Sequence, residues 1–133
     1  MLPLLVDHHI HRAPALRWAE GLMKGEVALC RAVQLSLVRL MCNRAIMGEF
    51  VIPASAAWTK VMELLDDERF DFSLEPATVD TVLPQLLRYA TPTGKLVSDA
   101  YLAAFSIAGN MRLATFDTGF RQFRGIDLHL LKP

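Results

Sequence analysis

Short apolar runs alternate with longer segments of helical character along this chain, and the pattern predicts strands and helices in turn. The apolar runs predict strands at 2–6, 27–30, 113–116 and 126–131, and alternating aromatic and charged residues predict another at 69–74. The segments between them predict helices at 13–23, 33–42, 55–65, 78–89 and 99–108. Because the two kinds of element alternate throughout, the pattern indicates an α/β sandwich with a mainly parallel sheet, formed as one domain over residues 1–133.

Serine, proline and glycine positions give the expected ends of these elements. Ser55 and Ser98 are expected to cap the helices that follow them. Pro84 should kink its helix or shift its start, and Gly109 with Asn110 should close the last helix in the left-handed conformation. A loop and a turn are expected at 48–53 and 91–94.

Composition narrows the classes of function only slightly. Hydrophobic residues make up 53% of the 133 residues, and 14 basic residues balance 14 acidic ones, so net charge gives no indication of a nucleic-acid partner. No apolar run reaches the roughly 18 residues that a membrane span needs, and the N-terminus lacks the basic region of a signal peptide. We therefore expect a cytoplasmic protein in which Cys30 and Cys42 are free, buried thiols.

Two aspartates lie where an open α/β sheet would bind a ligand. Asp117 directly follows the strand predicted at 113–116, and the crevice of such a sheet lies at the carboxyl ends of its strands. Asp99 opens a nearly all-apolar helix, next to the positive end of the helix dipole. Taken singly, each also fits an ordinary helix-end or turn carboxylate.

The residues around these aspartates carry a resemblance to a known family. The segments VSDAYLAA at 97–104 and LATFDTGF at 113–120 are similar to the C-terminal signature of VapC-type PIN domains, and LCRAVQLSLVRL followed by CNRAIMG at 29–48 resembles an earlier block. The resemblance covers residues 27–48 and 95–133, and between them it extends mainly to the order of helices. It implies a three-layer α/β/α fold whose central, mainly parallel sheet lies between helices.

The same resemblance implies a chemistry and a set of partners. PIN domains of this kind gather three or four acidic side chains at one end of the sheet, hold Mg²⁺ or Mn²⁺ there and cut RNA. They are toxins that pair with an antitoxin of the VapB kind, and a homodimer is implied. Asp99 and Asp117 stand at two of the acidic positions, and Arg39 matches an arginine of the family. A hard divalent ion suits such carboxylates, and it can acidify a water for attack on phosphate.

One acidic position of the family is occupied here by an amide. Gln34 stands where the family normally has a glutamate, so an oxygen is retained and a charge is lost. At an effective dielectric of about 20, two unit charges about 4 Å apart interact by about 4 kcal/mol, which makes the loss large for a divalent ion. The resemblance therefore implies an RNA-cutting enzyme with impaired activity. The alternative is a non-catalytic PIN module that dimerises and binds an antitoxin-like partner.

The first acidic position of the family is the point of greatest departure. Family members begin with a strand that ends in an aspartate, and a short helix and a histidine-bearing loop follow. In one alignment residues 9–18 match that loop and the helix after it, and the first strand and helix are missing. In the other, residues 4–6 form the strand and Asp7 stands at its end, with the first helix deleted. We favour the first on local similarity, and in both the N-terminal block is shorter than usual.

Two further polar clusters carry weaker indications. Three histidines at 8–11 suit zinc as a residue type, but a single turn cannot close a tetrahedral site without a distant ligand, so we expect a solvated loop. Arg121, Arg124 and Lys132 form a small basic tract that could contact an RNA backbone, and a solvated surface is the plainer interpretation.

Overall fold

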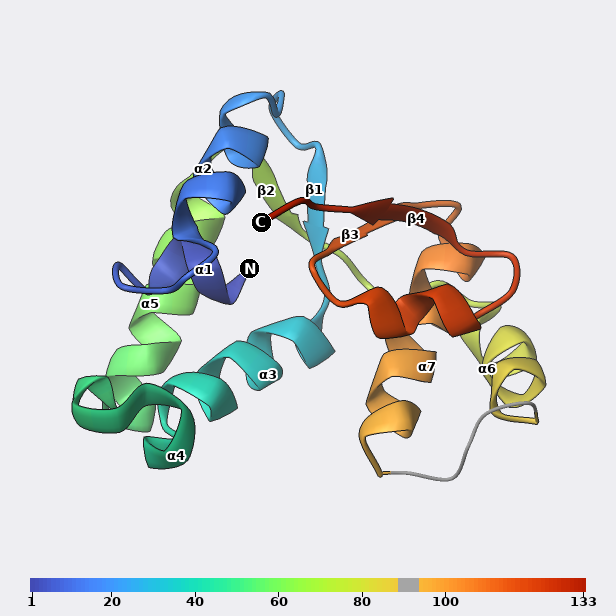
Figure 1. The fold of residues 1–133 in the computed structure, drawn as a ribbon. Helices are drawn as coiled ribbons and strands as arrows, with labels where there is room; N and C mark the ends of the chain where they lie inside the picture. The colour runs from blue at the N-terminus through green and yellow to red at the C-terminus, as the bar shows by residue number, and fades with distance from the viewer. Residues whose placement is uncertain (89–93) are drawn as a thin grey trace. The chain divides into compact units, whose positions relative to one another are not determined.

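The computed structural model describes residues 1–88 and 94–133, and Figure 1 shows the order of their helices and strands. The chain divides into two compact units, Met1–Leu74 and Glu75–Pro133, and each is described by itself. One domain over residues 1–133 stays a prediction. The turn predicted at 91–94 falls mainly outside the described residues.

The first unit consists of helices around one pair of parallel strands. Strand β1 (Val27–Leu29) pairs with β2 (Phe70–Phe72), with Val27 opposite Phe70. The helices are α1 (Leu2–Leu5), α2 (Arg12–Glu20), α3 (Arg31–Met41), α4 (Arg44–Met47) and α5 (Ala54–Asp66), and a short 3₁₀ turn, η1 (Gly48–Phe50), follows α4. The strands predicted at 27–30 and 69–74 and the helices predicted at 13–23, 33–42 and 55–65 are therefore confirmed.

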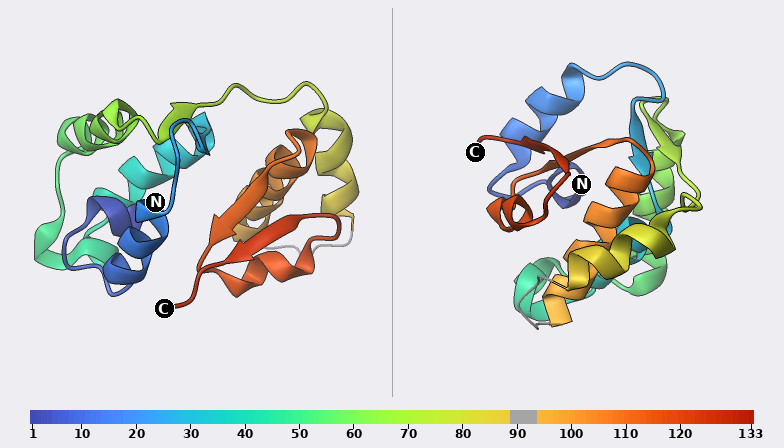
Figure 2. Two further views of the ribbon diagram at one scale, coloured as in Figure 1. Left: turned by 90° about the horizontal axis from the view of Figure 1, so that it is seen from above. Right: turned by 90° about the vertical axis from the view of Figure 1, so that its right-hand side faces the viewer.

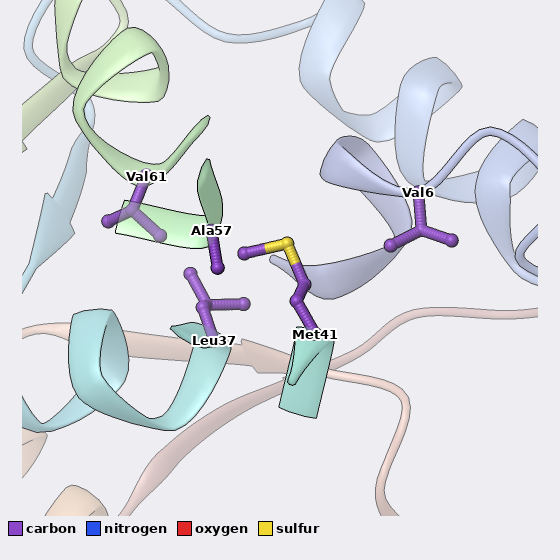
Figure 3. Packing of buried hydrophobic residues seen from close by; sticks show 5 residues of the cluster. All are labelled: Val6, Leu37, Met41, Ala57 and Val61. Atoms are coloured by element: carbon purple, nitrogen blue, oxygen red, sulfur yellow. The ribbon is translucent and has the colours of Figure 1, made fainter. Parts of the chain in front are cut away.

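Helices α3 and α5 meet along one row of apolar side chains. Leu37 and Met41 are one turn apart on α3, Ala57 and Val61 are one turn apart on α5, and all four are buried together with Val6 (Figure 3). Residues four apart lie on the same face of a helix, so this spacing presents one continuous apolar stripe to the partner helix. The stripe covers only part of α3, because Leu35 is exposed on its other side.

Two details of the first unit correct the sequence expectations. Residues 2–6 were expected as a strand, but Leu2–Leu5 is a short helix with proline in its first turn, a position that suits proline. A short apolar run fits a buried strand and a buried helix equally well, so its periodicity could not decide. Ser55 does not cap α5: the helix begins at Ala54 with Pro53 as the capping residue.

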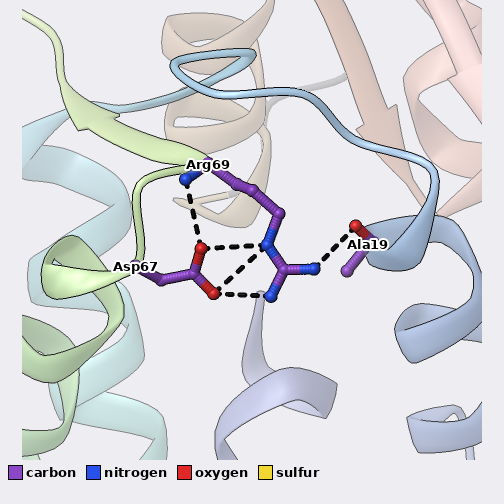
Figure 4. A network of polar contacts seen from close by, with 3 residues as sticks. All are labelled: Ala19, Asp67 and Arg69. Atoms are coloured by element: carbon purple, nitrogen blue, oxygen red, sulfur yellow. Dashed lines mark hydrogen bonds and ion pairs between the residues drawn. The ribbon is translucent and has the colours of Figure 1, made fainter.

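An ion pair fixes the end of α5 to the end of α2. The Arg69 guanidinium donates hydrogen bonds to the Asp67 carboxylate and, from Nη1, to the backbone oxygen of Ala19 at 2.8 Å (Figure 4). The hydrogen bonds that Asp67 accepts from the Arg69 side chain, and then the one from the Arg69 backbone N–H, lower the pKa of Asp67 from 3.8 to about 2. The pair thus joins two helices just before β2 begins.

The second unit contains another pair of parallel strands and two main helices. Helix α6 (Val79–Leu87) packs against α7 (Gly94–Ala108), and both are seen from two further directions in Figure 2. Strand β3 (Arg112–Thr115) pairs with β4 (Asp127–Leu130), and the 3₁₀ turn η2 (Thr118–Gln122) lies between them. Its core is a cluster of five buried residues: Leu96, Ala100, Ala103, Phe120 and Phe123.

Helix ends in the second unit also differ in part from expectation. Helix α7 begins at Gly94, so Ser98 lies inside it and does not cap it. At the other end Asn110 has a φ of 50° and closes the helix in the left-handed region as expected, whereas Gly109 does not adopt a positive φ. Pro84 lies inside α6, which runs from Val79 to Leu87.

The predicted α/β class is confirmed, since helices and parallel strands alternate along the chain. The four described strands pair two by two, β1 with β2 and β3 with β4. Within residues 1–88 and 94–133, no helix has the length and apolar character needed to cross a membrane.

Candidate functional site

Asp117 is held by its own turn just after β3. Its Oδ1 accepts a hydrogen bond from the backbone N–H of Gly119 at 2.7 Å, and its own N–H donates to Thr115 Oγ1 at 3.1 Å. Asp117 is thus the capping residue of η2, as its simpler interpretation predicted. The bond occupies one carboxylate oxygen and leaves Oδ2 for other partners. A Cβ on Gly119 would lie 2.9 Å from Oδ1, so the carboxylate approaches this backbone closely.

Asp99 lies within α7 and is largely enclosed. It was expected at the N-terminus of the helix, but the helix begins at Gly94, so Asp99 lies in the second turn and is not at the dipole end. Its side chain is 18% exposed. Burial raises the pKa of Asp99 first, and the negative charge of Asp117 raises it further, against the opposing effect of Lys95. The two aspartates predicted for the site are therefore close enough in the structure for the charge of one to affect the pKa of the other.

One lysine reaches both carboxylates. The Nζ of Lys95 lies 2.9 Å from Asp117 Oδ2 and 4.0 Å from Asp99 Oδ2. The hydrogen bond from Lys95, followed by that from Gly119, lowers the pKa of Asp117. The hydrogen bond to Asp117 and the negative charges of Asp117 and Asp99 raise the pKa of Lys95. Lys95 was not among the site residues predicted from the sequence. Its spacing of four residues before Asp99 was a usable signal, because residues four apart on a helix are neighbours.

Gln34 and Asp7 belong to the first unit and lie in opposite environments. Gln34 is 1% exposed, and its Oε1 accepts a hydrogen bond from Arg31 Nη1 at 2.7 Å. The Arg31 guanidinium also lies over the rings of Trp58 and Phe72, at 5.5 and 4.9 Å from their centres. The Asp7 side chain is 84% exposed and pairs with Arg12 at 2.8 Å. Asp7 follows a helix, so the alignment that placed it at the end of a strand is wrong on that point. A site role for Asp7 or Gln34 stays a prediction.

The carboxylate pair of the second unit suits a divalent cation by its donor chemistry. Mg²⁺ is commonly held by one or two carboxylates, with waters or substrate phosphates completing its shell. The Lys95 ammonium at this pair shows that Asp99 and Asp117 together accept a cation. Over the described ranges 1–88 and 94–133, however, no group of three or more His, Cys, Asp or Glu side chains could hold a metal ion. Within the described residues the pair can therefore offer two carboxylate ligands, and waters or substrate phosphates commonly complete the shell of such an ion.

The other polar clusters have ordinary structural surroundings. The ring of His8 lies against that of Phe50, with centres 3.6 Å apart, and His9 Nδ1 accepts a hydrogen bond from the His11 N–H. Cys30 and Cys42 are free, as expected, with Cys30 buried and Cys42 partly so. The basic tract lies on the surface, with all three members exposed: Arg121, Arg124 and Lys132.

Comparison with known proteins identifies the family. The model of the PIN domain matches residues 2–126. Ribonuclease VapC41 of Mycobacterium tuberculosis (strain H37Rv) is 35% identical over 135 residues, which cover 98% of this chain and 92% of the relative. Ribonuclease VapC37 of the same strain is 27% identical over 118 residues, covering 87% and 81%. The chain belongs to the PIN domain family, and its similarity to VapC ribonucleases confirms the resemblance first drawn from the sequence blocks.

Solved structures show the same fold at much lower identity. A chain of VapBC2 from Rickettsia felis, bound to a promoter DNA fragment, matches with a TM-score of 0.65 at 15% identity, over 97% of this chain and 91% of that one. A chain of VapBC-1 from nontypeable Haemophilus influenzae matches with a TM-score of 0.63 at 11% identity, over 90% and 84%. The predicted PIN-like α/β fold is thereby confirmed.

Proposed function

We propose that this protein is a VapC-like endoribonuclease, the toxin of a toxin–antitoxin pair, which hydrolyses RNA phosphodiester bonds with Mg²⁺ or Mn²⁺. The observation that carries the proposal is the pairing of Asp99 and Asp117 around one cationic group, in a chain 35% identical to a VapC ribonuclease. Family membership supplies the reaction class, and the carboxylate pair supplies the residues.

The side chains of the second unit have distinct tasks in this proposal. Gly119 fixes Asp117 Oδ1, so Oδ2 presents a defined ligand position. Asp99 adds a second oxygen from a partly enclosed position, where water competes less for the bound ion. When bound, a divalent ion would supply an acidified water and offset the charge that develops on the phosphate. RNA and an antitoxin of the VapB kind are the proposed partners, with the cytoplasm as the place of action and a homodimer as the assembly.

The proposed activity is weaker than that of a relative with a full acidic set. The resemblance assigns Gln34 to the family's glutamate position, and an amide there contributes no negative charge. The carbonyl oxygen of Gln34 is moreover engaged by Arg31. Gln34→Glu is expected to raise Mn²⁺ affinity, measured by calorimetric titration. An unchanged affinity would refute the assignment of Gln34.

Cleavage of structured RNA in the presence of Mg²⁺ or Mn²⁺ tests the catalytic proposal. Wild type is compared with Asp117→Asn and with the control Asp127→Asn, which changes an exposed aspartate of the same unit that pairs with Arg112. The expected result is metal-dependent cleavage by wild type and the control and none by Asp117→Asn. Equal inactivity of wild type and Asp117→Asn would refute the catalytic proposal.

A second candidate is a PIN module that dimerises and binds an antitoxin-like protein without cutting RNA. The observation that favours it is the uncharged Gln34, together with the lack, among the described residues, of a third acidic, histidine or cysteine side chain grouped with Asp99 and Asp117. Co-expression with the product of a short adjoining gene, followed by size-exclusion chromatography with light scattering, tests it. A stable complex that cuts no RNA after release of the partner would support this candidate over the enzyme.

A further inference from the structure

Lys95 occupies a helix position that helix stability does not favour. It lies in the first turn of α7, where the helix dipole disfavours positive charge. The order of the pair, with Lys95 four residues before Asp99, is the less favourable one for an ion pair along a helix. The first turn contains no acidic residue to compensate. The contact that Lys95 makes outside its own helix, with Asp117, therefore accounts better for its orientation.

The ammonium group takes up the oxygens that a metal ion would need. Gly119 already holds Asp117 Oδ1, so Oδ2 is the oxygen turned to a cation, and Lys95 Nζ lies 2.9 Å from it. The nearest contact of Lys95 with Asp99 is also with an Oδ2. An ammonium and a divalent ion cannot occupy the same position on these two oxygens.

The lysine can also leave. Its side chain is 72% exposed, and its four-carbon stem is flexible, so the ammonium can move into water while the backbone of α7 stays in place. An ion pair this exposed is weak, so a divalent ion on two carboxylates can displace the ammonium.

We propose that Lys95 is an internal counterion of Asp99 and Asp117, which neutralises the pair in the metal-free protein and competes with the divalent ion for it. This inference rests on the proposed function, since it takes the two aspartates as metal ligands. Lys95 is then a positioning residue that sets how much free cation the protein needs before the site is filled.

Mn²⁺ binding to the metal-free full chain tests the proposal, with free Mn²⁺ followed by electron paramagnetic resonance. Lys95→Met removes the charge and keeps the length of the side chain. Lys60→Met is the matched control, because Lys60 is an exposed lysine of helix α5 and has no ion pair among those found in the described residues. Lys95→Met is expected to bind Mn²⁺ about twofold to fivefold more tightly, where fivefold corresponds to the upper limit of about 1 kcal/mol for an exposed ion pair. Lys60→Met should bind as wild type does, and Lys95→Arg, which keeps the charge, should stay close to wild type.

Thermal unfolding gives a second measurement that needs no enzymatic activity. In excess chelator, Lys95→Met should unfold at a lower temperature than Lys60→Met, because two carboxylates lose their shared cation, and Mn²⁺ should raise its midpoint more than that of wild type. Unchanged or weaker Mn²⁺ binding by Lys95→Met, alongside loss of binding in Asp117→Asn, would overturn the counterion proposal alone. Absence of Mn²⁺ binding from wild type and every variant would overturn the proposed metal site, and the counterion proposal with it.

Discussion

Each unit of this protein contains a carboxylate bound to a basic side chain, and the two arrangements differ in their balance of charge. In the first unit one guanidinium serves one carboxylate, Asp67, and also bonds the backbone of α2. In the second unit one ammonium serves two carboxylates, Asp99 and Asp117. In the first arrangement the positive charge of Arg69 balances the negative charge of Asp67, and both carboxylate oxygens accept hydrogen bonds. In the second, one positive charge faces two negative charges.

The pKa shifts follow from this difference. Hydrogen bonds from Arg69 lower the pKa of Asp67 to about 2, so its ionised form stabilises the fold. Burial and the charge of Asp117 raise the pKa of Asp99, so its ionised form carries an energetic cost. A pKa raised by burial and by a specific charged neighbour is common at functional sites, which makes Asp99 the better functional candidate of the two.

The largest effect is expected from neutralising Asp99. Asp99→Asn should lower the rate of RNA cleavage by about 100-fold or more, the size seen when one electrostatic partner is removed from an active site. It should leave stability unchanged or raise it slightly, because an amide carries no charge for burial or Asp117 to oppose. Cleavage rates and urea unfolding of the same preparation check both halves. A clear loss of stability would show that Asp99 is a structural carboxylate like Asp67.

Asp67→Asn should have the opposite profile, with lower stability and unchanged cleavage. Because the folded pKa of Asp67 is about 2 and its ordinary value is 3.8, the ionised form contributes stability fully above pH 3.8 and loses it as the pH falls towards 2. The difference in unfolding free energy between wild type and Asp67→Asn should therefore be present at neutral pH and close over that range. Urea unfolding at a series of pH values measures it. If the difference in unfolding free energy persists at pH 2, the loss of stability in Asp67→Asn comes from altered packing or hydrogen-bond geometry and not from the lost charge.

The smallest effect is expected at the pair of Arg112 and Asp127, which joins β3 to β4 on the surface of the second unit. Both side chains are well exposed, so Arg112→Met should change the free energy of unfolding by only about 0.2–1 kcal/mol. Urea unfolding with and without added salt is the measurement. If Arg112→Met lowers the free energy of unfolding as much as Asp67→Asn does, the Asp67–Arg69 pair is no more important for stability than the exposed Arg112–Asp127 pair.

Much of the fold could be predicted because its signals are local. Turn residues precede the apolar runs at β1 and β3, and they follow the alternation at β2, so these strands could be identified without knowledge of distant contacts. The apolar run at 2–6 gave no such signal. A run of five apolar residues fits a strand or a helix equally well until its packing partners in the fold are known. In the structure Leu2–Leu5 is a helix, and its residues Leu2 and Leu5 pack against the core cluster that contains Val6.

In the candidate site, too, one feature could be predicted from the sequence and another could not. The meeting of Asp99 with Asp117 could be predicted, because the carboxyl end of a strand and the preceding helix converge at one edge of an α/β sheet. Lys95 was missed because the helix was expected to begin after Ser98, which left Lys95 outside it. Its spacing of four residues from Asp99 was therefore not recognised as a neighbour relation along one helix. An error in the position of a helix start, the least certain part of such predictions, thus concealed the pairing of Lys95 with Asp99.

Gly119, two residues after Asp117, is a position where an added methyl group should affect the chemistry of the site more than the stability of the fold. At Gly119 the atom that a new Cβ would crowd is Asp117 Oδ1, the far end of a side chain that can rotate away. Gly119 has no positive φ, so alanine fits its backbone and the turn survives the substitution. The carboxylate would move instead, and with it the oxygen offered to the cation. A screen that scored only expression or melting temperature would miss substitutions at residue 119. The orientation of the Asp117 carboxylate nevertheless depends on residue 119 having no side chain.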